Sequence, residues 1–410
     1  MGADRSGWPD DRGRPPGLCY TSGVDLSLSP EEEAFAEEAR AWLAANVTGR
    51  PDFDSLDESV AWGRGWQRRL AADRWVGISW PSAYGGRDAT PVQVALFHAE
   101  YARAGAPQPV NRVGINLVGP TLLAHGTEAQ RARWLPPILD ASEIWCQLFS
   151  EPDAGSDLAA LRTVAERVDG GWNVTGQKVW TSYATVARWG VALVRTDPGE
   201  PRHRGLSYMV VDLSADGVEV RPLRQITDES EFNEVFLDGV FVPDDHLVGG
   251  LGHGWAVANT TLAHERGVNF PFKEQVVHEV YLDELFREAE ARGVLADPVI
   301  ADDLIDALVG LRLLRTHNWR TLTRLGRDEE PGPESSLVKL SWTAMTQKLS
   351  SAALSVLGDE APLWPSPTGD DAVGTWQRQW LWSRAAGIAG GTSEIQRTIV
   401  AERMLDLPRG

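Results

Sequence analysis

The first part of the chain repeats apolar and polar positions with the period of amphipathic helices. The run Ser29-Pro30-Glu31-Glu32 predicts a helix start, with Ser29 as N-cap, Pro30 at the first helical position and Glu32 completing a capping box. An apolar stripe at helical spacing follows it: Phe35, Ala39, Trp42, Leu43 and Val47. Similar stripes cover residues 92–103, 120–125 and 128–139. The pattern predicts a helical N-terminal domain over residues 25–144, preceded by a flexible arm at residues 1–24.

The period changes between residues 145 and 250, where short β-rich runs alternate with turn residues. Runs at 163–168 and 172–174 flank Asp169-Gly170-Gly171, which is a strong signal for a tight hairpin. Further runs of this kind lie at 191–194, 206–211, 218–220 and 234–242. We therefore expect a middle antiparallel β domain of six or seven strands.

Helical periodicity returns over residues 251–410. It covers segments near 255–290, 300–325, 335–357, 373–386 and 392–405, with a break rich in Pro, Gly and Asp at 358–374. Helices, then strands, then helices predict an α+β protein in three blocks.

Composition excludes several classes of function. A net charge of -19 over 410 residues disfavours a nucleic-acid partner, because such binding depends on cation–phosphate contacts. No run approaches the roughly 18 apolar residues of a membrane span. The eight histidines are scattered and the two cysteines form no CxxC pair, so we expect no metal site. A reducing, cytoplasmic location fits this cysteine content.

Three clusters could carry chemistry. Residues 147–157 form a polar loop, residues 176–182 place Trp180 two positions from Ser182, and residues 387–397 form a glycine-rich loop that opens a helix. A helix N-terminus of the last kind suits a pyrophosphate. Taken singly, a surface turn, a core tryptophan with an incidental serine and an ordinary helix boundary would account for them.

Together and in this order, the clusters resemble the acyl-CoA dehydrogenase family of flavoproteins over residues 27–408. The resemblance rests on Ser150-Glu151-Pro152-Asp153-Ala154-Gly155-Ser156-Asp157, on Gly176-Gln177-Lys178-Val179-Trp180-Thr181-Ser182 and on Gly391-Thr392-Ser393-Glu394-Ile395-Gln396. It implies a helical domain, a β-barrel-like middle domain and a C-terminal four-helix bundle. It also implies bound FAD, an acyl-CoA or acyl-carrier thioester oxidised to the trans-2-enoyl product, and electrons passed to an electron-transfer flavoprotein.

The resemblance also implies roles for individual residues. Phe149 and Ser150 would contact the flavin ring, Trp180 would pack against it, and Ser182 would donate a hydrogen bond near N5. The positions expected to contact substrate or the outer parts of FAD are Ser156, Thr392, Glu394 and Arg292, the last across a subunit interface.

The catalytic base departs from the commonest family pattern. Many members carry a glutamate directly before the Gly-Thr of the C-terminal signature, where this chain has Gly390. Other members, including those for branched and bulky chains, carry it on the first C-terminal helix before an arginine, and Glu265-Arg266 resembles that version. The resemblance thus implies Glu265 as base, Arg266 beside the substrate, and the Gly390 N–H on the thioester carbonyl. A solvated glutamate paired with Arg266 is the alternative.

The segment expected at the subunit interface also departs from the family pattern. Where many members have Gln-x-x-Gly-Gly-x-Gly, this chain reads Ala353-Leu354-Ser355-Val356-Leu357-Gly358-Asp359. We expect a dimer or tetramer, either of one chain or of two different chains. A flavin-dependent oxidase or monooxygenase and a non-catalytic subunit of a hetero-oligomer are the alternative functions.

Overall fold

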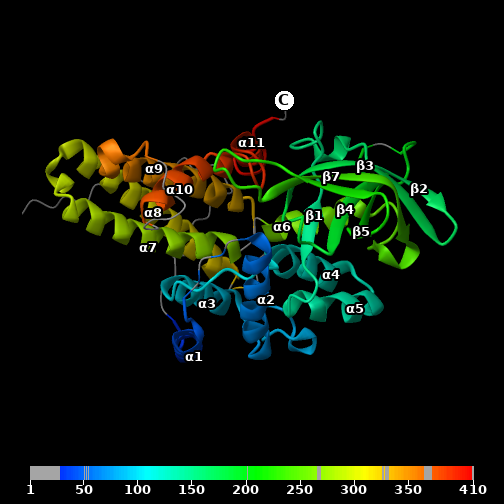
Figure 1. Ribbon diagram of the computed structural model, residues 1–410, viewed down its shortest axis with the longest axis horizontal. Helices are drawn as coiled ribbons and strands as arrows, with labels where there is room; N and C mark the ends of the chain where they lie inside the picture. Colours follow the sequence, from blue (N-terminus) through cyan, green and yellow to red (C-terminus); the bar gives the residue numbers. More distant parts are fainter. Residues whose placement is uncertain are drawn as a thin grey trace, which may run out of the picture.

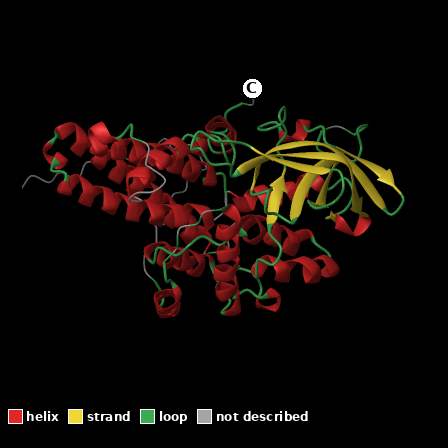
Figure 2. Ribbon diagram, in the orientation of Figure 1, coloured by secondary structure: helices red, strands yellow, loops and turns green. Residues whose placement is uncertain are grey.

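The computed structural model describes residues 28–49, 51, 53, 55–200, 202–265, 269–325, 327, 332–363 and 372–408. The predicted arm at residues 1–24 lies outside this range. The sheet and a set of long helices occupy opposite ends of the molecule, and the N-terminal helices lie along one side of both (Figure 1). The strands are confined to one end (Figure 2).

The N-terminal helices are α1 (Pro30–Asn46), α2 (Leu56–Ala72), α3 (Pro91–Arg103), α4 (Gly119–His125) and α5 (Glu128–Leu139). The capping box predicted for α1 is confirmed: the Glu32 N–H donates to Ser29 Oγ at 3.3 Å, and the Ser29 N–H donates to Glu32 Oε2 at 2.7 Å. Ala39 and Leu43 of the predicted stripe are buried. The sequence pattern missed α2.

The sheet has eight strands: β1 (Trp145–Leu148), β2 (Val164–Val168), β3 (Gly171–Ser182), β4 (Trp189–Arg195), β5 (Leu206–Asp212), β6 (Val218–Pro222), β7 (Phe232–Pro243) and β8 (Leu247–Val248). The predicted hairpin is confirmed, because Val168 pairs with Gly171 across Asp169 and Gly170, and Gly170 has φ of +72°.

Two expectations for the middle block were wrong. The strand order β6-β7-β3-β2-β4-β5-β8 is an open sheet, not a barrel, because no pairing joins its first and last strands. The sheet is not wholly antiparallel either, since β1 and β2 both pair with β4 in parallel. Parallel pairs need long crossover connections, which local turn signals do not reveal.

The central strands are buried on both faces. Val191 and Tyr208 pack into the core of the N-terminal helices, whereas Ala192 and Met209 pack into a second core formed by the sheet itself. The N-terminal helices therefore form a rigid support beneath β4 and β5.

The C-terminal helices are α6 (Gly254–Glu265), α7 (Asn269–Ala291), α8 (Pro298–Leu325), α9 (Ser335–Leu357), α10 (Ala372–Trp382) and α11 (Ser393–Arg403). The single segment expected at 255–290 is thus described as two helices. Helices α7 to α10 share one apolar core, which includes Leu285, Leu311, Trp342 and Trp376. The four-helix bundle and the domain limits at residues 24, 144 and 250 remain predictions.

Candidate functional site

A buried ion pair joins the first two signature segments. Lys178 of β3 is fully buried, and its Nζ donates to Glu151 Oε1 at 2.9 Å, the Phe149 carbonyl at 3.1 Å and the Leu193 carbonyl at 2.8 Å. Burial tends to raise the pKa of Glu151, but Lys178 and hydrogen bonds from the segment after the loop outweigh it and hold this pKa below its usual value. Burial lowers the pKa of Lys178 to about 8, against the opposing effect of Glu151, so both partners are charged at neutral pH.

The other Glu151 contacts fix the loop between the signatures. Its carboxylate accepts the Arg162 N–H at 2.6 Å, the Thr163 N–H at 2.9 Å and the Thr163 hydroxyl at 2.6 Å. A Cβ at Gly176 would lie 2.4 Å from the Thr163 Oγ1, so glycine is required for this close approach. The Val179 N–H also donates to the Ser150 carbonyl at 2.9 Å, which sets residues 149–151 directly beside β3.

Trp180 has the geometry of a functional residue rather than a core residue. Its φ is +59°, an uncommon value for a bulky side chain, and 62% of it is exposed. A register shift between Lys178 and Thr181 interrupts the β3–β7 ladder here, so strand alternation alone does not set the directions of Trp180 and Ser182. The indole meets Phe232 edge to face, with centroids 6.0 Å apart. It otherwise presents a free aromatic surface.

The serines of these segments keep their hydroxyls available. Ser150 and Ser182 are half-buried and Ser156 is exposed, and no hydrogen bond from these three hydroxyls is found within the described residues. The Phe149 side chain instead packs in the core against Tyr208, with centroids 5.9 Å apart. Phe149 therefore has its carbonyl and its ring already engaged within the protein.

The third segment forms a tight loop before α11. Gly390 and Gly391 have φ of +66° and +91°, values that favour glycine over a residue with a Cβ. Gln396 is fully buried, and its Nε2 donates to the Gly390 carbonyl at 3.1 Å. Thr392 caps α11 by accepting the Ile395 N–H at 3.3 Å, whereas the Glu394 side chain is exposed. Gln396, the last residue of the third signature, thus holds the glycine loop that begins the signature through a hydrogen bond.

The two residues expected at the base position are only partly placed. Glu265 is the final residue of α6, but its side chain lies outside the described part of the structure, as does all of Arg266. Helix α7 starts at Asn269, so the expected base stands at the junction of two helices.

Arg292 is engaged within its own chain. Its guanidinium contacts Glu288 Oε1 at 2.5 Å and Glu360 Oε2 at 2.8 Å. The hydrogen bonds that Arg292 donates to Glu360 and Glu288 raise its pKa, so it stays charged and is paired with two carboxylates. The contact with FAD across a subunit interface expected for Arg292 stays a prediction.

Sequence reasoning missed a polar cluster that joins all three blocks. Arg112, in the segment after α3, donates from Nη2 to the Tyr183 hydroxyl at 2.7 Å and lies 3.8 Å from Glu231. Arg378 of α10 forms two hydrogen bonds to Glu229, at 2.7 and 2.8 Å. The available sequence signal was that Tyr183 directly follows the second signature. In the structure, Tyr183 also has φ of +60°.

The site residues fit a flavin dinucleotide. Besides the free face of Trp180 and the two half-buried serine hydroxyls, Thr181 Oγ1 and Gln396 Oε1 are buried without a hydrogen-bond partner in the described chain. The described chain contains fifteen buried side-chain atoms of this kind, so these two are compatible with a bound group or water but do not by themselves mark a ligand site. These atoms lie in the second and third signatures.

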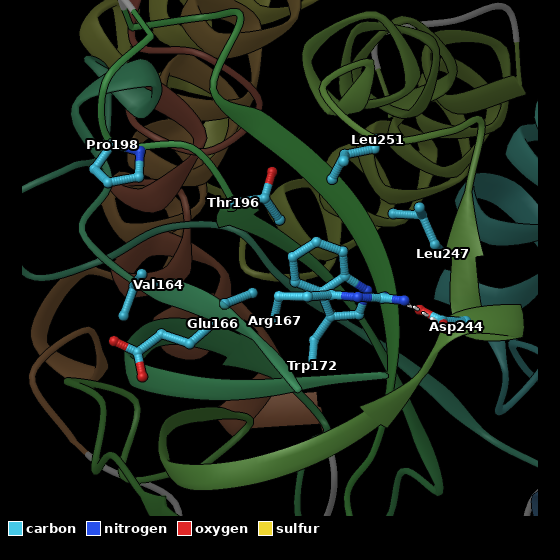
Figure 3. Close-up of a pocket in the computed structure, with 10 residues that line it drawn as sticks. Val164, Glu166, Arg167, Trp172, Thr196, Pro198, Asp244, Leu247 and Leu251 are labelled. Carbon is cyan, nitrogen blue, oxygen red and sulfur yellow. Dashed lines mark hydrogen bonds and ion pairs between the residues drawn. The ribbon is translucent and has the colours of Figure 1, made fainter. Parts of the chain in front are cut away.

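A separate open pocket of about 780 Å³ lies on the sheet, and Figure 3 shows its lining. Arg167 lies over the Trp172 ring, 4.9 Å from its centroid, and its Nη2 contacts Asp244 Oδ2 at 2.9 Å. No residue that the sequence predicted for the site lines this pocket.

Searches of the described residues found no cluster of three or more His, Cys, Asp or Glu able to hold a metal ion. Within the same ranges, no helix combines the length and apolarity of a membrane span.

Comparisons with known proteins agree on one family. Residues 29–142, 146–240 and 252–405 match the acyl-CoA dehydrogenase N-terminal, middle and C-terminal domains. Acyl-CoA dehydrogenase IpdE1 of Mycobacterium tuberculosis is 42% identical over 386 residues, which cover 92% of this chain and 98% of that protein. Two solved structures are also similar. One, described as the Tcur3481-Tcur3483 steroid ACAD, has a TM-score of 0.81 and 28% identity, over 94% of this chain and all of that one. The other, the ChsE4-ChsE5 complex from M. tuberculosis, has a TM-score of 0.79 and 27% identity, with the same coverage.

Proposed function

This chain belongs to the acyl-CoA dehydrogenase family of oxidoreductases, and from that premise we propose that it introduces the α,β double bond into a bulky acyl-CoA thioester. The observation that carries the proposal is the pair of signature segments locked together by Lys178 and Glu151, which leaves Trp180 and the serine hydroxyls free. Family membership makes FAD the cofactor that this arrangement receives.

The cofactor residues divide by the chemistry that they offer. Trp180 offers a ring face to the isoalloxazine, and Ser150 and Ser182 offer hydroxyls to its polar edge. Ser156, Thr392 and Glu394 are proposed for the outer parts of FAD or the substrate phosphates. When bound, FAD supplies the oxidant that takes the β-hydrogen as hydride. Phe149 contributes by packing, because its carbonyl is already occupied by Lys178.

We propose Glu265 as the base that removes the α-proton, with Arg266 on the substrate side. The Gly390 N–H would stabilise the negative charge that develops on the thioester carbonyl. The positive φ of Gly390 supports the assignment of the base to Glu265 rather than to position 390, because a glutamate at position 390 would be strained. A glycine there also leaves room beside the α-carbon for a branched or ring-bearing group.

The substrate class rests on this free space and on the relatives. A structure 28% identical to this chain is described as a steroid ACAD. A ring-bearing acyl group therefore fits both observations. The electron acceptor that we propose is an electron-transfer flavoprotein.

We propose that a different chain completes the oligomer. Arg292 is neutralised by Glu288 and Glu360, and Asp359 adds a further acidic residue at this end of α9. Such a surface would repel the pyrophosphate of a neighbour's FAD. One of the similar structures is a complex of two named chains. A mixed assembly would let a partner chain supply the cationic face that this one lacks.

The test is the visible spectrum of the protein, purified alone and with a candidate partner, recorded anaerobically before and after addition of acyl-CoAs. We expect bound flavin that straight chains bleach slowly and ring-bearing chains bleach fast. Glu265→Gln should bind FAD normally but bleach at least about a hundredfold more slowly, because the amide keeps the shape and loses the basicity. Glu33→Gln, an exposed change in α1, is the matched control.

Two results would overturn these assignments. Bleaching by Glu265→Gln at the normal rate would remove Glu265 as the base. Bound flavin that no thioester bleaches would remove the dehydrogenase assignment and favour an oxygen-using flavoprotein.

A further inference from the structure

Three buried hydroxyl groups meet where the three blocks of the chain join. Thr121 lies on α4 of the N-terminal helices, Tyr208 on β5 of the sheet and Thr261 on α6 of the C-terminal helices. All three side chains are at most 1% exposed. The Thr121 and Thr261 Oγ1 atoms are 2.9 Å apart, and the Tyr208 hydroxyl lies 3.2 Å from Thr261 Oγ1. Each block thus contributes one residue to this hydroxyl junction, and Thr261 lies at its centre.

The hydrogens of the hydroxyl junction have one consistent direction, because a hydroxyl group carries a single hydrogen. Thr121 donates to the Leu117 carbonyl at 2.7 Å, so Thr261 is the donor across the 2.9 Å contact. The other acceptor near Thr261, the Val257 carbonyl, is farther away at 3.3 Å. With the hydrogen of Thr261 used, Tyr208 is the donor to Thr261. Burial raises the pKa of Tyr208, so its hydroxyl keeps the proton that this series of bonds requires.

These bonds fix α6 against two other elements. A buried hydroxyl that loses its partner costs free energy, so α4, β5 and α6 cannot slide past one another without a penalty. A second bond joins the same two helices, since His125 Nε2 lies 2.7 Å from Thr260 Oγ1. The series ends on Leu117 in η2 (Gly114–Val118), a π-helical turn of a kind that is frequent at functional sites.

The hydroxyl junction connects the two halves of the proposed site. On the flavin side, the Phe149 ring meets the Tyr208 ring edge to face with centroids 5.9 Å apart, and the Phe149 carbonyl accepts a hydrogen bond from Lys178. On the base side, Glu265 ends α6 four residues after Thr261, which is about one helical turn. Tyr208 therefore contacts both the loop of the first signature and the helix that bears the proposed base.

The proposed reaction depends on the relative position of these two halves. The α-proton and the β-hydrogen leave from neighbouring carbons, so the base and the flavin must be placed together on one substrate. A misplacement of about 1 Å caused by a remote change can cost about a hundredfold in rate. A shift of α6 would displace the base in this way, because Glu265 is the last residue of that helix.

We propose that Thr121, Tyr208 and Thr261 are positioning residues, which set the end of α6 that bears the base relative to the loop that contacts the flavin. This inference rests on the proposed function, because it concerns the proposed base Glu265. The three hydroxyls act through the position of α6 and not by contact with the substrate.

The test measures anaerobic flavin bleaching in Thr261→Val, which keeps the shape of threonine and loses the hydroxyl. The substrate is cyclohexylpropanoyl-CoA, unlabelled or with deuterium on the α-carbon, and the flavin-loaded protein is used with its partner chain where loading needs one. We expect the rate constant per bound flavin to fall about tenfold or more at saturating substrate. The α-deuterium isotope effect should rise, because removal of the α-proton becomes slower relative to the other steps. The Kd of the 2-enoyl product, measured by calorimetry, should stay within about twofold.

Two companion variants and one control accompany this measurement. Thr261→Ser keeps the hydroxyl and should restore most of the rate, whereas Tyr208→Phe should slow bleaching although the bond between the two threonines remains. Thr346→Val is the matched control, because Thr346 is a buried threonine on α9 with its Oγ1 3.1 Å from His278 Nε2. Thr346→Val should lower the urea midpoint much as Thr261→Val does, but leave the rate constant and the isotope effect unchanged.

A normal rate constant per bound flavin and a normal isotope effect in Thr261→Val would overturn the inference, even if that variant were less stable or bound less FAD. If Thr261→Val did not fold, normal bleaching by Tyr208→Phe would overturn it equally. Both results would leave the dehydrogenase assignment intact. Failure of every thioester to bleach the wild type would instead overturn the proposed function itself.

Discussion

Breaking the Lys178–Glu151 pair should destabilise the protein strongly, because Lys178 is fully buried and only 7% of Glu151 is exposed. Lys178→Met removes an ammonium that donates three hydrogen bonds and leaves the Glu151 carboxylate and the Phe149 and Leu193 carbonyls short of a donor. Removal of one partner from a buried pair costs about 3–5 kcal/mol. We therefore expect a loss of this size in the free energy of unfolding.

A double-mutant cycle separates the pair from the packing around it. Glu151→Gln alone leaves a buried ammonium and should cost about 3 kcal/mol, whereas adding it to Lys178→Met removes the uncompensated charge and should cost about 1 kcal/mol or less. The expected coupling is about 2 kcal/mol, measured by urea unfolding followed by tryptophan fluorescence. FAD content should fall in both single variants, because the pair sets residues 149–151 beside β3.

The matched control is Glu219–Arg221, an exposed pair on β6 with an Nε–Oε1 distance of 2.7 Å. Its cycle should couple by about 0.5 kcal/mol or less. Two results would contradict this role of the pair. One is a decrease of under about 1 kcal/mol in the free energy of unfolding of Lys178→Met, and the other is additivity of the two single changes.

Three further changes test single features of the site. Trp180→Gly should weaken FAD binding at least about tenfold but change the free energy of unfolding by under about 1 kcal/mol, because the residue is exposed and its φ is positive; a core tryptophan would cost about 3–5 kcal/mol. Gly176→Ala should lower both FAD content and the melting temperature, since its Cβ would meet the Thr163 hydroxyl, and unchanged values in a thermal scan would contradict this. The pKa of His98 is lowered to about 3, so the unfolded chain binds its proton first as pH falls below about 6.5. Stability should therefore fall from pH 7 to pH 5 by about 1–2 kcal/mol more in the wild type than in His98→Gln, and equal urea midpoint shifts would refute this.

Features encoded by neighbouring residues were predictable from the sequence. The capping box at Ser29 and the hairpin at Gly170 depend on side chains and backbone angles within a few positions, and both are confirmed. Helix α2 was missed because Gly63 and Gly65 interrupt its helical pattern. A Cβ at Gly63 would lie 3.2 Å from the Val110 Cβ, so that glycine serves a tertiary contact that a local pattern does not contain.

Features that depend on distant residues were not predictable in this way. The strand order of the open sheet and the parallel pairing of β1 and β2 with β4 join segments that are distant in the sequence, and local alternation does not encode such pairings. The ion pair between Arg292 and Glu360 joins residues 68 positions apart, and the sequence does not reveal it. Whether a charged side chain is paired depends on the residues packed against it, and these can come from segments distant in the sequence.

The signature motifs combine two kinds of residue that a sequence does not distinguish. Glu151 and Lys178 are ionisable members of their segments, and by chemistry alone they would be candidates for catalysis. In the fold they satisfy each other and the backbone, whereas Ser150, Trp180 and Ser182 keep free donors or a free face. Glu151 and Lys178 hold the loop beside β3, and we propose that Ser150, Trp180 and Ser182 contact the ligand.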